Sequence, residues 1–232
     1  MPATEDLFTP IHKGIRSMIY DVAGRLQSND FANLDASKPL LADLETEFSA
    51  ALSTGCVLCL LHQHGLDEES QVFPAVGQFD PGLVVEFIED HHELARHHSV
   101  ITKMARDMIT RESPEERVRF GAELNREANI FFADYQEHMN REERKLVPMM
   151  RLRFTDEQLR ALRSTIMRSM PPERLAAILR WMLPSLNVAE LTAMVAGAKA
   201  ALPPEQFQLL AGLGAKYVGP ERWQLVQQRS GT

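Results

Sequence analysis

Apolar residues recur at helical spacing along almost the whole chain, and this periodicity is the strongest constraint on its fold. From residue 81 to residue 109, for example, apolar side chains return three and four positions apart, which is the pattern of a helix with one buried face. No stretch alternates polar and apolar residues between turn signals, as a strand would. The sequence therefore predicts an all-α protein.

Prolines and capping residues divide the first part of the chain into four long helices. We expect the first over residues 9–26 or from slightly earlier, and the second over about 39–73, where the Pro after Phe73 should end it. A third covers 81–109, and a fourth, capped by Ser113 and Pro114, ends near Pro148. Long helices with short connections favour an up-and-down four-helix bundle.

After residue 152 the pattern changes to short helices with a period of sixteen residues. Apolar residues lie fourth and seventh after each expected start, which is an i, i+3 stripe behind a cap. The expected starts are Thr155, Pro171, Asn187, Pro203 and Gly219. We therefore predict two regions, a bundle over residues 1–152 and five short helices over 153–232 that pack as a small domain or array. Coincidental spacing of ordinary amphipathic helices is the alternative.

Charge and hydropathy exclude several classes of partner. The net charge of −7 argues against nucleic acid, because phosphate binding needs a basic surface. The start "MPATEDLFTP" has acids where a targeting peptide would have basic residues, and no apolar segment approaches the length of a membrane span. We expect a cytoplasmic protein that binds neither nucleic acid nor membrane.

The two cysteines, Cys56 and Cys59, form a C-x-x-C pattern that redox pairs and zinc sites also use. A zinc site of four thiolates needs two further cysteines, and a redox pair needs a strand before it. Because this pair lies inside a helical apolar run, we expect both residues to be buried core thiols.

Two segments repeat one spacing of histidine and glutamate. "HGLDEE" places Glu68 four residues after His64, and "HMNREE" places Glu142 four residues after His138. Residues four apart lie on the same face of a helix, so each segment presents an imidazole and a carboxylate together. One such pair is commonly a surface salt bridge. Two such pairs on different helices are typical of metal ligands.

The other two predicted long helices add one histidine each. His91 lies three residues from both Ile88 and Leu94, which marks its face as buried, and His12 lies near the start of the first helix. A single buried histidine is commonly a hydrogen-bonded core residue. Burying four histidines and two carboxylates without a metal would be costly, so the six together predict a metal centre.

The order "IHKGIR", "HQHGLDEESQVFP", "EDHHEL" and "HMNREERKLVP" resembles the hemerythrin-like, or HHE cation-binding, family over roughly residues 8–152. Members of that family hold a non-haem di-iron centre in a four-helix bundle. The resemblance implies two iron ions, with manganese or zinc able to substitute. It also implies bridging carboxylates from Glu68 and Glu142, and terminal ligands from the histidines of the four segments, namely His12, His64, His91 and His138.

One position departs from the oxygen-carrying hemerythrins, which have two histidines four residues apart on the third helix. Here His91 is followed at that spacing by Ala95, and His92 by Arg96. This resembles branches with fewer histidines, which include iron-responsive and iron-sulfur repair proteins. We expect the spare histidines His62, His92 and His97 to point away from the centre. His98 either supports a metal ligand or is an ordinary, partly buried histidine with a hydrogen bond. We expect Glu69 and Glu143 either to support metal ligands or to lie at the surface.

Six such ligands supply about four protein bonds to each of two metal ions, which leaves positions for an exogenous molecule. We therefore expect a protein that binds or senses O₂, NO or labile iron. The C-terminal helices are the expected surface for a partner protein or a second copy of the chain. The alternative is a di-iron enzyme of NO or peroxide detoxification or of iron-sulfur cluster repair. Turnover, as opposed to stoichiometric binding, separates the two.

Overall fold

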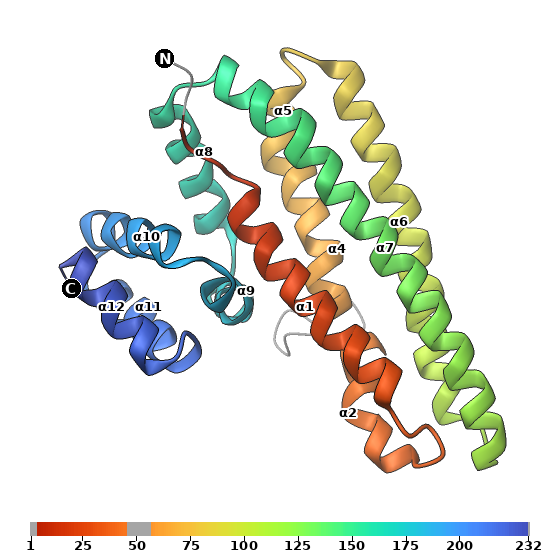
Figure 1. Ribbon diagram of the computed structural model, residues 1–232. Helices are drawn as coiled ribbons and strands as arrows, with labels where there is room; N and C mark the ends of the chain where they lie inside the picture. Colours follow the sequence, from red (N-terminus) through yellow and green to blue (C-terminus); the bar gives the residue numbers. More distant parts are fainter. Residues whose placement is uncertain (1–3, 46–56, 232) are drawn as a thin grey trace.

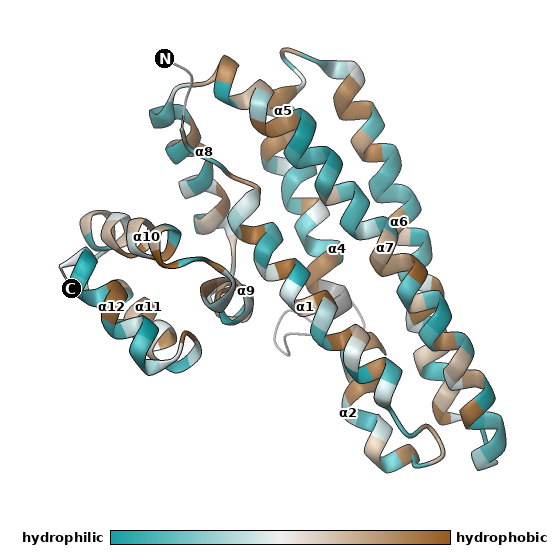
Figure 2. Cartoon of the chain, viewed as in Figure 1, coloured by the Kyte–Doolittle hydropathy of each residue, from teal (hydrophilic) through white to brown (hydrophobic). Residues whose placement is uncertain are grey.

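The computed structural model describes residues 4–45 and 57–231, and over these residues the chain is entirely helical (Figure 1). The expectation of an all-α protein is confirmed for this part of the chain. Cys56 lies outside the described residues, as does the side chain of Cys59, so the expectation of buried thiols is not tested. None of the described helices is long and apolar enough to cross a membrane, and hydrophilic residues occur along every long helix (Figure 2).

The first region contains α1 (Thr9–Ser28), α4 (Val57–Asp67), α6 (Pro81–Ile109) and α7 (Pro114–Arg153). They lie side by side, and α2 (Leu34–Glu45) packs against one end of the group (Figure 1). Their buried faces contribute to two apolar clusters, one that includes Val22, Leu61, Ile101 and Phe131 and one that includes Phe87 and Leu146. Burial of one stripe per helix is what the helical periodicity of the sequence requires.

Three proline positions differ from the prediction. The second helix was expected to begin near Pro39, but α2 begins at Leu34 and contains that proline. A π-helical segment, η1 (Glu68–Val72), and α5 (Phe73–Val76) carry the helix past Pro74. Likewise α7 continues beyond Pro148 to Arg153. Proline removes one backbone hydrogen bond, but the wide turn of η1 precedes Pro74. Around Pro148, the buried side chains of Leu146, Val147 and Met150 hold the last turns of α7 in place.

Five short helices follow, each beginning one residue after a predicted start. Their bounds are α8 (Asp156–Ser169), α9 (Pro172–Ser185), α10 (Val188–Ala201), α11 (Pro204–Tyr217) and α12 (Pro220–Ser230). Thr155 and Asn187 each form a reciprocal capping box with the residue three positions later. Such caps satisfy backbone N–H groups that would otherwise lack partners at the starts of α8 and α10. Helices α9, α11 and α12 instead begin with a proline in the first turn, where its missing N–H group has no partner to lose.

Contacts cross the predicted boundary near residue 152. Leu159 of α8 is buried in the same apolar cluster as Leu146 and Met150 of α7. Helix α9 lies along α1, and the approach is so close that a Cβ atom on Gly14 would lie 2.9 Å from the Cα of Met182. Helices α10 to α12 pack with the end of α9 around a separate cluster of their own. The C-terminal region thus shares α8 and α9 with the core of the first region.

Candidate metal centre

The structure brings the six predicted ligand residues together between α1, α4, α6 and α7. Five of them are buried and His64 is partly buried. They form two groups whose ligand atoms lie within 4.8 Å of one another and which are able to hold a metal ion. Both groups contain Glu68 and Glu142; the first adds His12 and His64, and the second adds His91 and His138.

Glu68 directs its two oxygens to different histidines. Its Oε1 atom lies 3.1 Å from Nε2 of His64 and 3.9 Å from Nε2 of His12. Its Oε2 atom lies 3.4 Å from Nε2 of His91. Glu68 is also the first residue of the π-helical segment, a kind of turn that is frequent at functional sites.

Glu142 is arranged in the same way from the opposite side. Its Oε2 atom lies 3.4 Å from Nε2 of His12, while Oε1 lies 3.2 Å from Nε2 of His138 and 4.0 Å from Nε2 of His91. Each glutamate therefore offers one oxygen to each pair of histidines. Each of the two ligand groups thus contains carboxylate oxygens from both glutamates.

The inward-facing atoms of this cluster lack ordinary hydrogen-bond partners among the described residues. The buried atoms without a hydrogen-bond partner include Nε2 of His12, Nε2 of His64 and all four carboxylate oxygens of Glu68 and Glu142. Nε2 of His91 and Nε2 of His138 face each other at 3.0 Å. Buried polar atoms without partners are costly and rare in folded proteins. A cation bound by either group would give such atoms a partner, so the residues fit a metal.

In three of the four histidines, the ring nitrogen that does not face the centre, Nδ1, contacts a further carboxylate. The Nδ1 atoms of these rings face carboxylate oxygens: His12 lies 2.9 Å from Glu143, His91 lies 2.8 Å from Glu69, and His138 lies 3.3 Å from Asp90. An ionised carboxylate only accepts hydrogen bonds, so Nδ1 must carry the hydrogen. The Nε2 lone pair then faces the centre, as a metal ligand requires.

Two of these outer carboxylates, Glu143 and Asp90, are themselves kept ionised. Burial opposes the ionisation of Glu143, but hydrogen bonds from His12 and from Arg16, whose Nη1 donates at 2.8 Å, lower its pKa to about 2. Burial likewise opposes the ionisation of Asp90, and its contacts with His138 and Arg141 lower its pKa to about 2. Glu69 and Glu143 were expected from sequence as supporting or surface carboxylates, whereas Asp90 was not identified. Only its place beside His91 in "EDHHEL" could have indicated it.

Without metal, the histidines titrate far from their ordinary range. Burial lowers the pKa of His12 and His138, but the surrounding carboxylates outweigh it and raise these pKa values to about 9 and about 10. Burial dominates at His64, whose pKa falls to about 3. At neutral pH the metal-free protein therefore balances its buried carboxylates with protons on His12 and His138.

The remaining histidines take no part in the two ligand groups. His97 is directed to acids at the surface, with ring nitrogens 3.6 Å from Asp134 and 3.9 Å from Glu127. The rings of His62 and His98 stack with centroids 5.7 Å apart. His92 is exposed. The ring contact of His98 is thus with His62, which is not one of the six predicted ligands.

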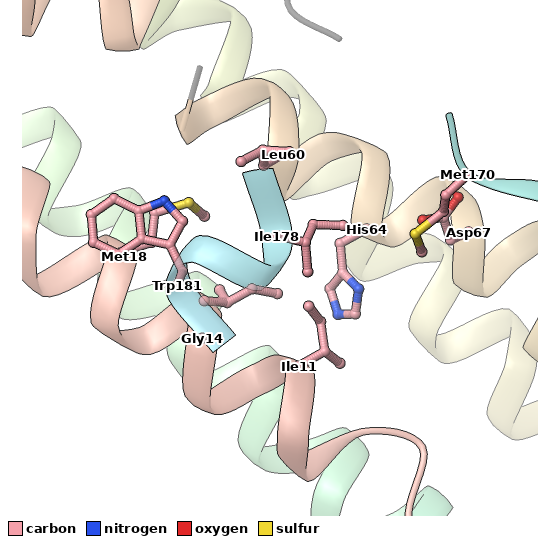
Figure 3. A pocket seen from close by; sticks show the side chains of 10 residues that line it. Ile11, Gly14, Met18, Leu60, His64, Asp67, Met170, Ile178 and Trp181 are labelled. Atoms are coloured by element: carbon pink, nitrogen blue, oxygen red, sulfur yellow. The ribbon is translucent and has the colours of Figure 1, made fainter. Parts of the chain in front are cut away.

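Helix α9 closes the side of the centre where His64 lies. The ring of His64 points into a small cavity of about 40 Å³, between Ile11 of α1 and Ile178 of α9 (Figure 3). Arg174 of α9 is buried and pairs with Asp67, the residue before Glu68. The C-terminal region therefore forms part of the wall around the candidate centre.

In comparisons with protein-family models, with curated proteins and with solved structures, nothing matches this chain.

Proposed function

We propose that this protein is a non-haem di-iron protein of the hemerythrin-like type, in which α1, α4, α6 and α7 form a four-helix bundle around two iron ions. The observation that carries the proposal is the placement of Glu68 and Glu142, each with one oxygen toward either pair of histidines. The mixture of imidazole and carboxylate donors suits iron or manganese, and zinc can occupy the same ligands.

We further propose that the centre binds or senses a small molecule, namely O₂, NO or labile iron. Two iron ions so held would supply open coordination positions for such a molecule. The chain contributes an apolar enclosure: the ring of Phe73 stacks on His91 with centroids 5.4 Å apart, and Phe87 meets His138 at 5.7 Å. Phe8 covers His12 at 5.6 Å. Apolar walls favour small uncharged molecules over charged or bulky ones.

The position of the C-terminal helices supports a role in passing on the state of the centre. Helix α9 contacts α1 along its length and reaches Asp67 through Arg174, one residue from Glu68. A movement of Glu68 would therefore act on Asp67, which pairs with Arg174 of the C-terminal region. We propose that α10 to α12 offer the surface for a partner protein or a second copy of the chain.

Metal analysis tests the first proposal. Protein produced in iron-replete medium should contain two irons per chain and show an optical spectrum of a carboxylate-bridged pair. Glu68→Ala should lose at least one of the two. A full complement of iron in that variant would contradict the bridging role.

Gas titration tests the second proposal. The ferrous protein, exposed anaerobically to NO or briefly to O₂, should change its spectrum with no more than about one event per centre, since each ion has only one or two free positions. Glu68→Ala should not respond. Sustained consumption of NO or peroxide with excess reductant would instead favour the enzyme. No response from protein shown to hold two ferrous ions would exclude gas binding and leave iron sensing or storage.

A further inference from the structure

A second, larger cavity lies between α4 and α6, beside the candidate centre. Its volume is about 150 Å³. Exposed His92 stands at its rim, and buried residues of α7, Phe131 and Tyr135, form its floor. His91 of the second ligand group also lines it. The cavity thus extends from the surface to the side of the centre, and none of the functions proposed above uses it.

Two small residues on facing helices create this space. Gly65 of α4 lies against His91 of α6, and a Cβ atom there would lie 3.3 Å from Nδ1 of that ring. Ala95 lies one turn after His91 and contributes only a methyl group to the lining. A longer side chain at position 95 would occupy the space on the same face of α6, because residues four apart lie one above the other.

The lining is mostly apolar, with a few polar atoms at defined places. Leu61, Leu66 and Leu94 form the walls. The Tyr135 hydroxyl donates a hydrogen bond to the carbonyl of Leu61 at 2.9 Å, so its oxygen remains able to accept one. Nε2 of His98 is buried and has no hydrogen-bond partner among the described residues. A buried polar atom in this state calls for a partner.

Charge narrows the class of molecule that fits. Burial, followed by the neighbouring His62 ring, lowers the pKa of His98 to about 4, so this imidazole is neutral at physiological pH. The carboxylate of Glu69 also lines the cavity, with its Oε1 atom 2.8 Å from Nδ1 of His91, and no Lys or Arg lies among the described lining residues, so the lining disfavours an anion. Apolar pockets of about this volume take molecules the size of benzene.

We propose that this cavity is a binding site for a small uncharged molecule of about the size of a single aromatic ring, carrying one hydrogen-bonding group that pairs with His98. The apolar walls supply the affinity, and the buried Nε2 atom of the partly exposed His98 ring selects the polar group. The site uses residues outside the two metal-ligand groups for recognition, so it does not depend on which ion the centre holds. Its contact with His91 places the bound molecule next to the centre.

Phenol and benzene are suitable probes, because they share a ring and differ in one hydroxyl group. Their affinities for the full-length chain are measured by ligand-observed NMR titration, in metal-free and in iron-loaded protein. Both probes should bind saturably to each form. Ala95→Met should weaken both at least tenfold by filling the cavity. The matched control Ala133→Met, at an exposed position of α7, should leave both unchanged.

The polar contact is tested separately. His98→Phe keeps a ring in place but removes its nitrogens, so it should weaken phenol several-fold and leave benzene unchanged. His97→Phe, one residue away and directed to Asp134, should change neither. Circular dichroism establishes that each variant is folded. The site would be overturned if neither probe bound saturably, or if Ala95→Met did not weaken the binding. The role of His98 would be overturned if the affinity for phenol fell equally in His98→Phe and His97→Phe. Because metal-free protein is included, these outcomes are independent of the proposed di-iron function.

Discussion

Oε1 of Glu69 lies 2.8 Å from Nδ1 of His91, and the equivalent contact between Glu143 and His12 measures 2.9 Å. Each of these glutamates directly follows one that faces the centre. The doubled acid in "HGLDEE" and "HMNREE" therefore has two tasks: the first glutamate faces both histidine pairs, and the second orients a histidine of a neighbouring helix. The same division occurs on both helices, which gives the centre an approximate internal symmetry.

This division predicts graded losses of metal. Glu69→Gln and Glu143→Gln should each retain both metal ions with affinity about 10–100-fold lower, since outer partners of ligating histidines typically contribute that much. Glu142→Ala should lose metal outright, because its two oxygens face both pairs. Competition with a chelator measures the affinities, and Glu137→Gln, an exposed residue paired with Arg144, is the control. Complete loss in the Glu143 variant, or no loss in the Glu142 variant, would refute the assignment.

The two adjacent histidines of α6 should behave differently. His91 is buried within a ligand group, whereas His92 is exposed. His91→Ala should therefore lower the metal content per chain, and His92→Ala should leave it unchanged. Elemental analysis of both variants, purified side by side, makes the comparison. Equal effects would show that the wrong neighbour has been assigned.

Metal-free protein should become less stable at alkaline pH. The pKa values of His12 and His138 in the folded chain are about 9 and about 10, above the ordinary value of 6.5. Their protonation therefore stabilises the metal-free fold fully below about pH 6.5, and this contribution is lost as the pH rises through the folded values. The urea concentration at the unfolding midpoint of the metal-free protein should decrease as the pH rises from 7 to 10.

Metal should reverse that trend. Ligation requires neutral imidazoles, so metal binding releases the protons of His12 and His138 and strengthens as the pH rises. The gap in urea midpoint between loaded and metal-free protein should widen from pH 7 to pH 10. Loading at pH 7 should release at least two protons per chain, measured in a weakly buffered solution with an indicator dye. An unchanged gap, together with no proton release, would argue against these two histidines as ligands.

Local features of the chain were predictable from sequence, and contacts between distant segments were not. The starts of α8 and α10 depend on the caps Thr155 and Asn187, which act within three residues, and the other short helices begin with a proline. The pairing of His64 with Glu68 depends only on the helical repeat. By contrast, nothing local in the sequence shows that Asp90 reaches His138 on another helix.

The proline errors have a related cause. Proline was expected to end a helix at Pro74 and near Pro148, since it lacks an N–H group. In the structure, burial of Val76 beyond the first and of Met150 beyond the second favours continued helix. Tertiary packing of this kind commonly overrides local preference, and it cannot be read from one segment alone.

The close contact between α1 and α9 gives a final test, in which two glycines of one helix should respond oppositely to the same change. A Cβ atom on Gly14 would lie 2.9 Å from the Cα and 3.0 Å from the backbone nitrogen of Met182, so α9 must move in Gly14→Ala. Overpacking of this kind typically costs about 1–3 kcal/mol. No atom lies within 4 Å of a Cβ on Gly24, so Gly24→Ala should instead stabilise α1 by about 0.5–1 kcal/mol through helix propensity.

Urea unfolding measures both effects, and tryptophan fluorescence locates the first. Trp181 lies beside Gly14 in the cavity where α9 meets α1, so Gly14→Ala should shift its emission to longer wavelength as water reaches the ring. Because His64 lines the same cavity, this variant should also lose metal to a chelator faster than Gly24→Ala does. A Gly14 variant with unchanged stability, emission and metal release would show that α9 does not dock on α1 in solution, and that the C-terminal helices leave the centre uncovered.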